Sequence, residues 1–375
     1  MTLHEIQARS LIRNYKKIDS WFISKYGMNL YRGCQHNCVY CDGRNEKYQV
    51  SGEFGNEIDV KVNAIELIKK EMNLNRRHKF YQNGFIMVGG GVGDSYQPAE
   101  KTYELTRNVL TFIESVRLPV HILTKSTLVE RDIDLLHQIN KNSKALISFS
   151  FSSTNDDVSS IFEPRVPPPS ERLQTITKLK QEGFSCGMFL LPVIPFITDT
   201  ADVMKQTIKD AAEAGADYII FGGMTLKTGK QKKFFYEIIK NHFPEMLPNY
   251  EMIYMDNKWG NASEPYYHSI NQTFQHIIKH YRIPKRIPSR LFNDVVSDHD
   301  RVVIILDQLH YLLQLHGKRS PYGFAAYKIS RLDHDITTMK NKLQSIKGVG
   351  RVTGKIILEI LETKTSSYYE KMLIS

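Results

Sequence analysis

Short runs of apolar residues alternate with longer amphipathic segments between residues 28 and 222. The runs are apolar on both faces and about as long as buried strands of a parallel sheet. They lie at residues 28–31, 85–88, 120–123, 145–149, 187–191 and 218–221. Segments of helical period lie between them, at about 60–74, 98–116, 127–141, 170–183 and 201–214. This strict alternation predicts a parallel sheet with right-handed crossovers, but periodicity does not decide whether the sheet curls into a barrel.

The pattern changes after residue 222. Residues 227–233 carry four lysines, and residues 246–270 are rich in Pro, Tyr and Asn with weak periodicity. Residues 276–290 contain no acid, and their five cations could extend a basic surface. These cations are Lys279, Arg282, Lys285, Arg286 and Arg290.

The last part of the chain is helical in pattern. Residues 301–315 are apolar and end at Gly317, a typical helix cap, and a final pair of helices is expected at about 333–345 and 352–362. The sequence contains no internal repeat. We expect three regions along the chain. They are a core with an N-terminal extension (1–225), a basic and irregular extension (226–290) and a helical region (291–375).

Composition excludes several classes of protein. The 375 residues are 41% hydrophobic and 24% charged, as in ordinary globular proteins, and their net charge is +10. That charge permits contact with a polyanion, although solubility accounts for it equally well. The sequence lacks the apolar stretch of about 20 residues that a membrane span needs, and residues 1–5 carry charges. These features predict a cytoplasmic protein without membrane contact.

Three of the four cysteines lie within eight residues. Cys34, Cys38 and Cys41 can converge on one metal centre if the backbone loops around it, and Gly33 permits the tight turn. Structural zinc needs a fourth ligand, for which neither His36 nor the distant Cys186 is convincing. Three cysteines without a fourth suit a [4Fe–4S] cluster with one iron open to another ligand, although zinc and unrelated thiols remain as alternatives.

The CxxxCxxC spacing, with Tyr40 before the last cysteine, resembles the signature of radical S-adenosylmethionine enzymes. Further motifs follow in order at 31–34 (YRGC), 93–100 (GDSYQPAE), 123–126 (LTKS), 131–134 (RDID), 162–165 (FEPR) and 171–173 (ERL). Together they resemble the spore photoproduct lyase-like branch, often labelled DNA repair photolyase-related, over residues 8–225.

The resemblance implies a partial (β/α)6 TIM-like barrel, with the active site at the carboxyl ends of its strands. It also implies a [4Fe–4S] cluster bound by the three cysteines. Electrons from a donor such as flavodoxin or ferredoxin would then cleave S-adenosylmethionine to a 5′-deoxyadenosyl radical. The family pattern further implies residues that contact the cofactor. They are Tyr40, Gly89, Gly90, Gly91, Lys125, Ser150 and Leu191.

This chain departs from spore photoproduct lyase at one point. The family's hydrogen-donating cysteine follows the second strand, where residues 89–96 read GGGVGDSY without cysteine. We expect Cys186 to be buried and structural. Asp94 and Tyr96 are therefore the catalytic candidates, with packing or a loop ion pair as their alternatives.

Residues 343–356 resemble a helix-hairpin-helix motif. The backbone N–H groups at Gly348 and Gly350 would face a phosphate, and Lys347, Arg351 and Lys355 would add charge. The alternative is a helical hairpin used for packing or dimerisation. We therefore expect a lyase-like or repair-like radical enzyme acting on DNA. The alternatives are a radical enzyme that modifies a peptide, RNA or small molecule, and a zinc-bound nucleic-acid-binding module.

Overall fold

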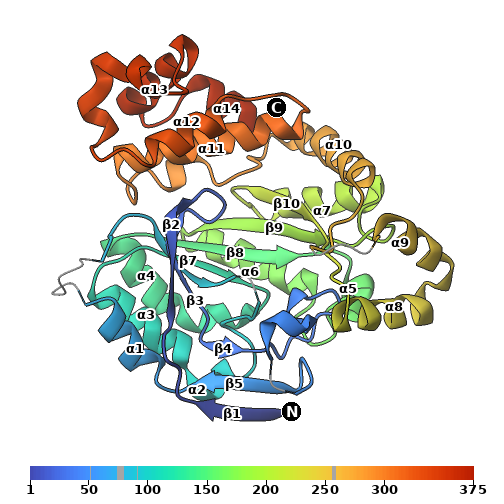
Figure 1. The fold of residues 1–375 in the computed structure, drawn as a ribbon. Coiled ribbons are helices and arrows are strands. Elements are labelled where there is room, and N and C mark those ends of the chain that lie inside the picture. The colour runs from blue at the N-terminus through green and yellow to red at the C-terminus, as the bar shows by residue number, and fades with distance from the viewer. Residues whose placement is uncertain (51, 74–79, 91, 256–258) are drawn as a thin grey trace.

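A seven-stranded sheet forms the centre of the chain in the computed structural model, which describes all residues except 51, 74–79, 91 and 256–258 (Figure 1). The strand order is β10-β9-β8-β7-β6-β3-β2, and the sheet is curled into an incomplete barrel. The strands are β2 (Ile12–Asp19), β3 (Ser24–Met28), β6 (Phe85–Gly89), β7 (Val120–Thr124), β8 (Ala145–Phe151), β9 (Ser185–Val193) and β10 (Ile219–Gly223). Each of the six strands β3 and β6–β10 pairs parallel with its neighbours in that group.

The partial (β/α)6 barrel with C-terminal helices is thus confirmed, with one addition and one shift. β2 pairs antiparallel with β3 at the edge of the sheet and was not expected. The first expected strand, at 28–31, divides: β3 ends at Met28, and β4 (Tyr31–Arg32) joins a separate three-stranded sheet. That sheet has the order β1-β5-β4, with β1 at Thr2–Ile6 and β5 at Glu57–Lys61.

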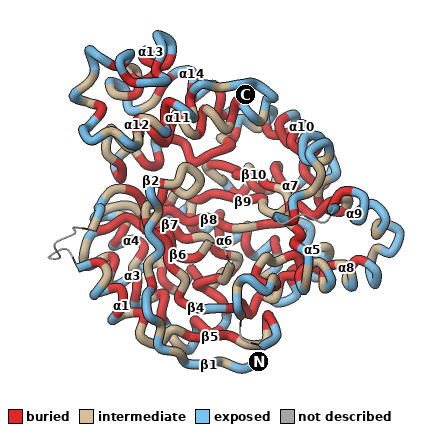
Figure 2. Tube along the Cα trace, in the orientation of Figure 1, coloured by how far each residue is buried: buried red, intermediate tan, exposed pale blue. Residues whose placement is uncertain are grey.

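Helices cover the outer face of the curled sheet. They are α1 (Ala64–Glu71), α2 (Glu100–Tyr103), α3 (Leu105–Ser115), α4 (Ile133–Asn142), α5 (Asp156–Phe162), α6 (Pro169–Gln181) and α7 (Ala201–Glu213), with the 3-10 helix η3 (Thr127–Asp132). Alternate residues of β8, from Ala145 to Phe151, enter the core beneath these helices. Strands β6 to β10 therefore appear almost wholly buried in Figure 2, whereas the edge strand β2 is largely exposed.

The inner face of the sheet is covered by the C-terminal helices. Leu146, Phe189 and Ile220 point to this face and share a second core with α11 (Asp298–Leu315). The remaining helices are α8 (Lys230–His242), α9 (Leu247–Ile253), α10 (Glu264–Tyr281), α12 (Tyr322–Ile329), α13 (Arg351–Thr363) and α14 (Ser367–Ile374), with the 3-10 helices η4 (Pro244–Met246), η5 (Ser289–Leu291) and η6 (Ile336–Ser345). Within the described residues, no helix is both long and apolar enough for a membrane span.

Two expectations for the second half of the chain need correction. The segment expected to be irregular, 226–290, contains α8, α9 and α10, so it is largely helical. The acid-free stretch does not form one basic surface, because Lys285 and Arg286 are buried. They follow the end of α10, where Pro284 accepts the N–H of Ile219 in β10 and Lys285 donates its own N–H to Leu373.

Candidate functional site

The cysteine loop follows β4 and turns back on itself. Gly33 has φ +83°, and a side chain there would place Cβ 2.7 Å from the carbonyl oxygen of Glu57. The backbone N–H of Asn37 donates to the carbonyl of Cys34, and that of Cys41 donates to Cys38, both at 3.3 Å. These turns hold the three thiols on one loop, which ends in the 3-10 helices η1 (Asp42–Arg44) and η2 (Glu46–Tyr48).

The loop is fixed to its surroundings by polar side chains. Arg44 donates from Nε to the carbonyl of Cys38 at 3.0 Å, and its guanidinium stacks on Phe234. On the other side, the N–H of Gln35 donates to Oε1 of Gln97 at 2.8 Å. Contacts on both sides therefore hold the cysteine loop against the rest of the protein.

The three thiols are free and largely shielded from water. Cys34 and Cys38 are buried and Cys41 is half-buried. Burial raises the pKa of all three thiols, that of Cys38 to about 12. Burial therefore favours the neutral thiol, whereas a metal centre favours the thiolate because it binds the deprotonated sulfur. Three cysteines on one loop fit a [4Fe–4S] cluster with one open iron better than structural zinc, which takes four protein ligands.

Asp94 joins the segment after β6 to the end of β7. Its carboxylate accepts the N–H of Tyr96 at 2.8 Å, the N–H of Lys125 at 2.7 Å and the hydroxyl of Thr124 at 2.8 Å. His36 of the cysteine loop lies 3.5 Å from it, through Nδ1. With its oxygens occupied in this way, Asp94 is placed to position the loops rather than to exchange a proton.

Three expected cofactor residues come together at the ends of β7, β8 and β9. Lys125 donates from Nζ to the Ser150 hydroxyl at 3.1 Å, and this hydroxyl donates to the carbonyl of Leu191 at 2.9 Å. The Lys125 ammonium also lies 5.6 Å from the centre of the Tyr40 ring. This contact links the strand ends to the loop that carries the cysteines.

Glu163 is the centre of this group, and the sequence prediction assigned it no role. The carboxylate accepts from Lys125 at 2.9 Å, from Arg172 at 2.6 Å and from the Tyr40 hydroxyl. Burial alone would raise the pKa of Glu163, but the Arg172 and Lys125 charges and the Tyr40 hydroxyl hold it well below its usual range. Glu163 and Arg172 belong to the FEPR and ERL motifs, so the signal that could have found them was present in the sequence.

Glycines shape the turn after β6. Gly89 and Gly90 have φ values of +82° and +90°, and a Cβ at Gly89 would lie 2.5 Å from the Leu123 carbonyl oxygen. These positions therefore require glycine whatever they bind. Gly91 lies outside the described residues.

Tyr96 and Cys186 are placed in the outer core. Both side chains have no exposed surface. Burial and the Asp132 carboxylate raise the pKa of the Tyr96 hydroxyl well above its usual range. This placement favours packing for Tyr96 over transfer of a hydrogen atom. Cys186 lies at the start of β9, far along the strand from Leu191 near the other end.

The hairpin residues lie in the C-terminal helices, and Figure 1 shows α13 and β4 in opposite halves of the molecule. Lys347, Arg351 and Lys355 are exposed. The two glycines differ. Gly348 has φ +93° and faces the Phe324 ring, whereas a Cβ at Gly350 would meet nothing within 4 Å. Gly348 is thus required for the turn and its packing, and Gly350 leaves the start of α13 open.

Comparison with known proteins gives one family. The Radical SAM superfamily profile matches residues 28–206. An uncharacterized protein of Methanocaldococcus jannaschii is 31% identical over 231 residues, which cover 61% of this chain and 80% of that protein. An uncharacterized protein of Mycobacterium tuberculosis is 26% identical over 258 residues, covering 68% and 74% respectively.

Solved structures are more distant. A spore photoproduct lyase mutant aligns with a TM-score of 0.49 and 18% identity, over 74% of this chain and 79% of that one. The profile match includes the cysteine loop and the ends of β6 to β9, where the side chains described above converge. This chain belongs to the radical SAM superfamily and is a radical SAM enzyme.

Proposed function

We propose that Cys34, Cys38 and Cys41 bind a [4Fe–4S] cluster and that the enzyme reductively cleaves S-adenosylmethionine to act on DNA. One observation carries the first part. The loop with three free cysteines contacts, through Tyr40, the Lys125–Ser150–Leu191 group at three consecutive strand ends. Ligand sites of parallel α/β folds lie at this edge of the sheet.

Different side chains at the strand ends would contact different parts of the cofactor. When bound, the cluster and S-adenosylmethionine supply the electron transfer and the carbon-centred radical. The Lys125 side chain is 13% exposed, so its ammonium can reach the carboxylate of the cofactor, and Glu163, which is paired with Arg172, holds this ammonium at the strand ends. Ser150 and the Leu191 backbone orient the adenosyl part. The buried surroundings of the thiols exclude water from a reactive radical.

The C-terminal hairpin supports a nucleic-acid substrate. Ile346 and Val349 are buried and fix the turn, whereas Lys347, Arg351 and Lys355 remain exposed around the start of α13. The first N–H groups of a helix are unpaired within it and favour a phosphate, and nearby cations add attraction that reads no sequence. A reduced electron donor with an acidic surface, such as flavodoxin or ferredoxin, completes the system.

One observation favours the competing function, a radical enzyme for a peptide or small molecule with the hairpin used for assembly. Val352, at the start of α13, is 67% exposed, as an apolar contact between subunits would require. A salt-sensitive mobility shift of DNA, with a monomer in solution, distinguishes the first function from this one.

Anaerobic turnover with deuterated DNA tests the proposal directly. The reconstituted and reduced enzyme is incubated with S-adenosylmethionine and with damaged or modified DNA carrying deuterium on its sugars and bases. We expect deuterium in the 5′-deoxyadenosine product, because the radical removes a hydrogen atom from its substrate. Cleavage of S-adenosylmethionine without deuterium transfer from any DNA, together with transfer from a deuterated peptide, would contradict a DNA substrate and leave the radical chemistry standing.

A further inference from the structure

Arg286 is a buried cation whose two terminal nitrogens lack a hydrogen-bond acceptor in the described part of the chain. The side chain lies after α10 and is 1% exposed. Neither Nη1 nor Nη2 has a partner among the described residues. A buried charge without partners is costly, so this arrangement asks for an explanation.

The other buried arginines of the described chain do not share this feature. Arg172 donates from Nη2 to Glu163, Arg301 donates to the carbonyl of Asn293, and Arg44 donates to that of Asn37. Arg286 interacts electrostatically with the Tyr311 hydroxyl and, more weakly, with the Asp19 carboxylate, but neither oxygen forms a well-aligned hydrogen bond with Nη1 or Nη2. Asp19 is itself engaged by the N–H groups of Trp21 and Phe22.

Aromatic side chains from three elements surround the guanidinium. It lies 4.0 Å from the ring centre of Trp21, in the turn between β2 and β3, and 3.6 Å from that of Tyr311 on α11. The two rings meet edge to face at 67°, so the guanidinium lies in the angle between them, and its buried Nη1 and Nη2 donors remain without an acceptor among the described residues. Trp21 and Tyr311 are half-buried, and the nearby Tyr267 of α10 is 38% exposed, so the rim of this group is open to solvent.

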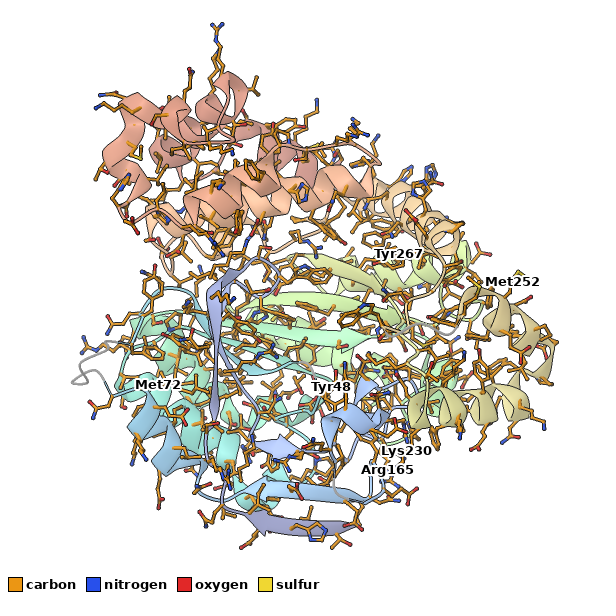
Figure 3. The ribbon with its side chains drawn as sticks, viewed as in Figure 1. Tyr48, Met72, Arg165, Lys230, Met252 and Tyr267 are labelled. Atoms are coloured by element: carbon orange, nitrogen blue, oxygen red, sulfur yellow. The ribbon has the colours of Figure 1, made fainter. Side chains whose placement is uncertain are left out.

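The group borders the inner face of the barrel. Trp21 packs against the second core, which includes Phe189 and Ile220, and so does Leu191. The ring of Tyr267 lies against Gly223 at the carboxyl end of β10, and Figure 3 shows Tyr267 between α10 and the sheet. Ser150, which donates to Leu191, continues this face toward Lys125. The group therefore lines the inner face of the barrel. Trp21 and Arg286 lie near the amino ends of β3 and β10, and Tyr267 lies at the carboxyl end of β10, the end of the strands where the cofactor residues lie.

We propose that Trp21, Tyr267, Arg286 and Tyr311 form a cradle that binds a phosphodiester of the substrate strand and stacks an adjoining base. This inference rests on the proposed function. The in-plane donors of a guanidinium match two oxygens of a phosphate, and aromatic faces accept any base. The phosphate supplies the partner that Arg286 lacks. A nucleotide turned out of its strand is the form of DNA that such an internal cradle accepts.

The test uses Trp21 as its reporter. The chain has two tryptophans, so Trp259→Phe leaves Trp21 as the single tryptophan, which can be excited selectively at wavelengths that tyrosine does not absorb. The reconstituted protein is titrated with a thymidine dinucleotide, which has one phosphodiester, and with thymidine, which has none. We expect the dinucleotide to change Trp21 fluorescence and to bind at least about 10-fold more tightly than thymidine, as charge-assisted hydrogen bonds allow.

Two variants separate the cradle from a structural role. Arg286→Met should weaken dinucleotide binding by about 10-fold or more with little change in the melting temperature, because Met keeps the packing against Trp21 and Tyr311 and removes a buried charge whose Nη1 and Nη2 lack an acceptor within the described structure. Arg13→Met is the matched control, since Arg13 also stacks on a ring, that of Tyr15, but lies outside the cradle. Its dinucleotide affinity should equal that of the parent.

Three results would overturn the cradle. These are parent-like dinucleotide affinity in folded Arg286→Met, equal binding of thymidine and dinucleotide, or equal competition by an acidic dipeptide. The deuterium experiment keeps the two proposals distinguishable. If Arg286→Met keeps the parental KM for DNA and still transfers deuterium, the cradle is wrong and the DNA substrate stands. If the dinucleotide binds as expected but no DNA gives transfer, the proposed function is wrong and the cradle stands.

Discussion

The strand ends of the barrel and the hairpin of the C-terminal helices hold their charges in opposite ways. At the strand ends, Glu163 is buried and paired with Lys125 and Arg172, and every partner comes from a different element. In the hairpin, Lys347, Arg351 and Lys355 are exposed. The two regions are built from similar residue types, so burial and pairing make the difference.

This difference predicts which measurement each region should affect. Buried, paired charges are costly to disturb, so changes at the strand ends should alter stability, cofactor binding and the response to pH. Exposed charges are screened by salt, so changes in the hairpin should alter ligand affinity and its salt dependence, with little effect on folding.

The largest effect is expected at the cysteine loop. Anaerobically reconstituted protein should hold about four irons per chain, as a [4Fe–4S] cluster requires. Cys34→Ala, Cys38→Ala or Cys41→Ala should each abolish the cluster absorbance and the cleavage of S-adenosylmethionine. Cys186→Ala is the control and should retain both, because Cys186 is buried near the opposite end of β9. Stoichiometric zinc without iron in the parent would contradict the cluster.

Glu163→Gln should cause the next largest effect. It leaves the Arg172 and Lys125 charges buried without a carboxylate, a change that costs about 3–5 kcal/mol of unfolding free energy. Glu130→Gln is the control, because Glu130 pairs with Lys178 at the surface and should cost about 1 kcal/mol or less. Denaturant unfolding compares the two. Equal midpoints for both variants would show that the buried group does not stabilise the fold.

The fold and part of this site were predictable because parallel strands carry simple signals. Runs apolar on both faces predicted five of the six parallel strands, whereas β3 was expected four residues too late along the chain. Because carboxyl ends of such strands meet at one edge, Lys125, Ser150 and Leu191 were expected together, and the structure brings them together. The antiparallel strand β2 escaped because an edge strand of mostly polar residues lacks the apolar signal.

The rest depends on tertiary contacts that local pattern does not encode. Glu163 and Arg172 belong to motifs that the sequence analysis identified. Their ion pairs could not be predicted, because Lys125, Glu163 and Arg172 lie on separate elements that only the folded chain brings together. We expected Lys285 and Arg286 at the surface, because a sequence does not show which way a side chain points. Both are buried in the segment that connects α10 to α11. The covering of the inner face by α11 likewise follows from packing between distant segments.

The barrel should also respond to pH through His121. Burial lowers the pKa of this histidine to about 4. Its Nδ1–H donates to the carbonyl of Phe22, and its Nε2 accepts from Ser148, so the folded state needs the neutral ring. Between pH 6.5, the usual pKa of histidine, and about pH 4, His121 is protonated in the unfolded chain but neutral in the folded protein, so protonation favours the unfolded state.

The parent should therefore lose up to about 3 kcal/mol of stability as the pH falls from 6.5 to 4. Unfolding of His121→Gln should show a shallower dependence over this range. A residual slope is expected from His36, whose pKa burial also lowers. An unchanged slope in the variant would place the pH response elsewhere.

Lys125→Ala tests cofactor binding with a moderate expected effect. The change removes a charge-assisted contact, a loss of about 1.5–3 kcal/mol or about 10- to 150-fold in affinity for S-adenosylmethionine. The fold should survive, because Arg172 still pairs with Glu163. Lys178→Ala, at an exposed ion pair, is the control. Calorimetry on reconstituted protein measures both, and parental affinity in Lys125→Ala would refute the assignment while leaving the cluster intact.

The hairpin should show the smallest effect on folding and a clear effect on salt dependence. With about three to five phosphates neutralised, the logarithm of DNA affinity should fall with the logarithm of salt at a slope of about −3 to −4. Changing Lys347, Arg351 and Lys355 together to Gln should flatten the slope by about 2 to 3, since each phosphate contact contributes about one. Gly348 is left intact, because a side chain there would strike Phe324 and distort the turn.

The control for the hairpin is a triple Lys→Gln change at Lys69, Lys70 and Lys141, which are exposed on α1 and α4. It removes the same net charge, so it separates a local contact from the overall attraction of a basic protein. Both triple variants should melt within a few degrees of the parent, because surface substitutions alter stability little. If both triple variants flatten the slope equally, the hairpin cations contribute to DNA binding only through the net charge of the protein. If the parent binds no DNA at low salt, the exposed Val352 and the assembly function take its place.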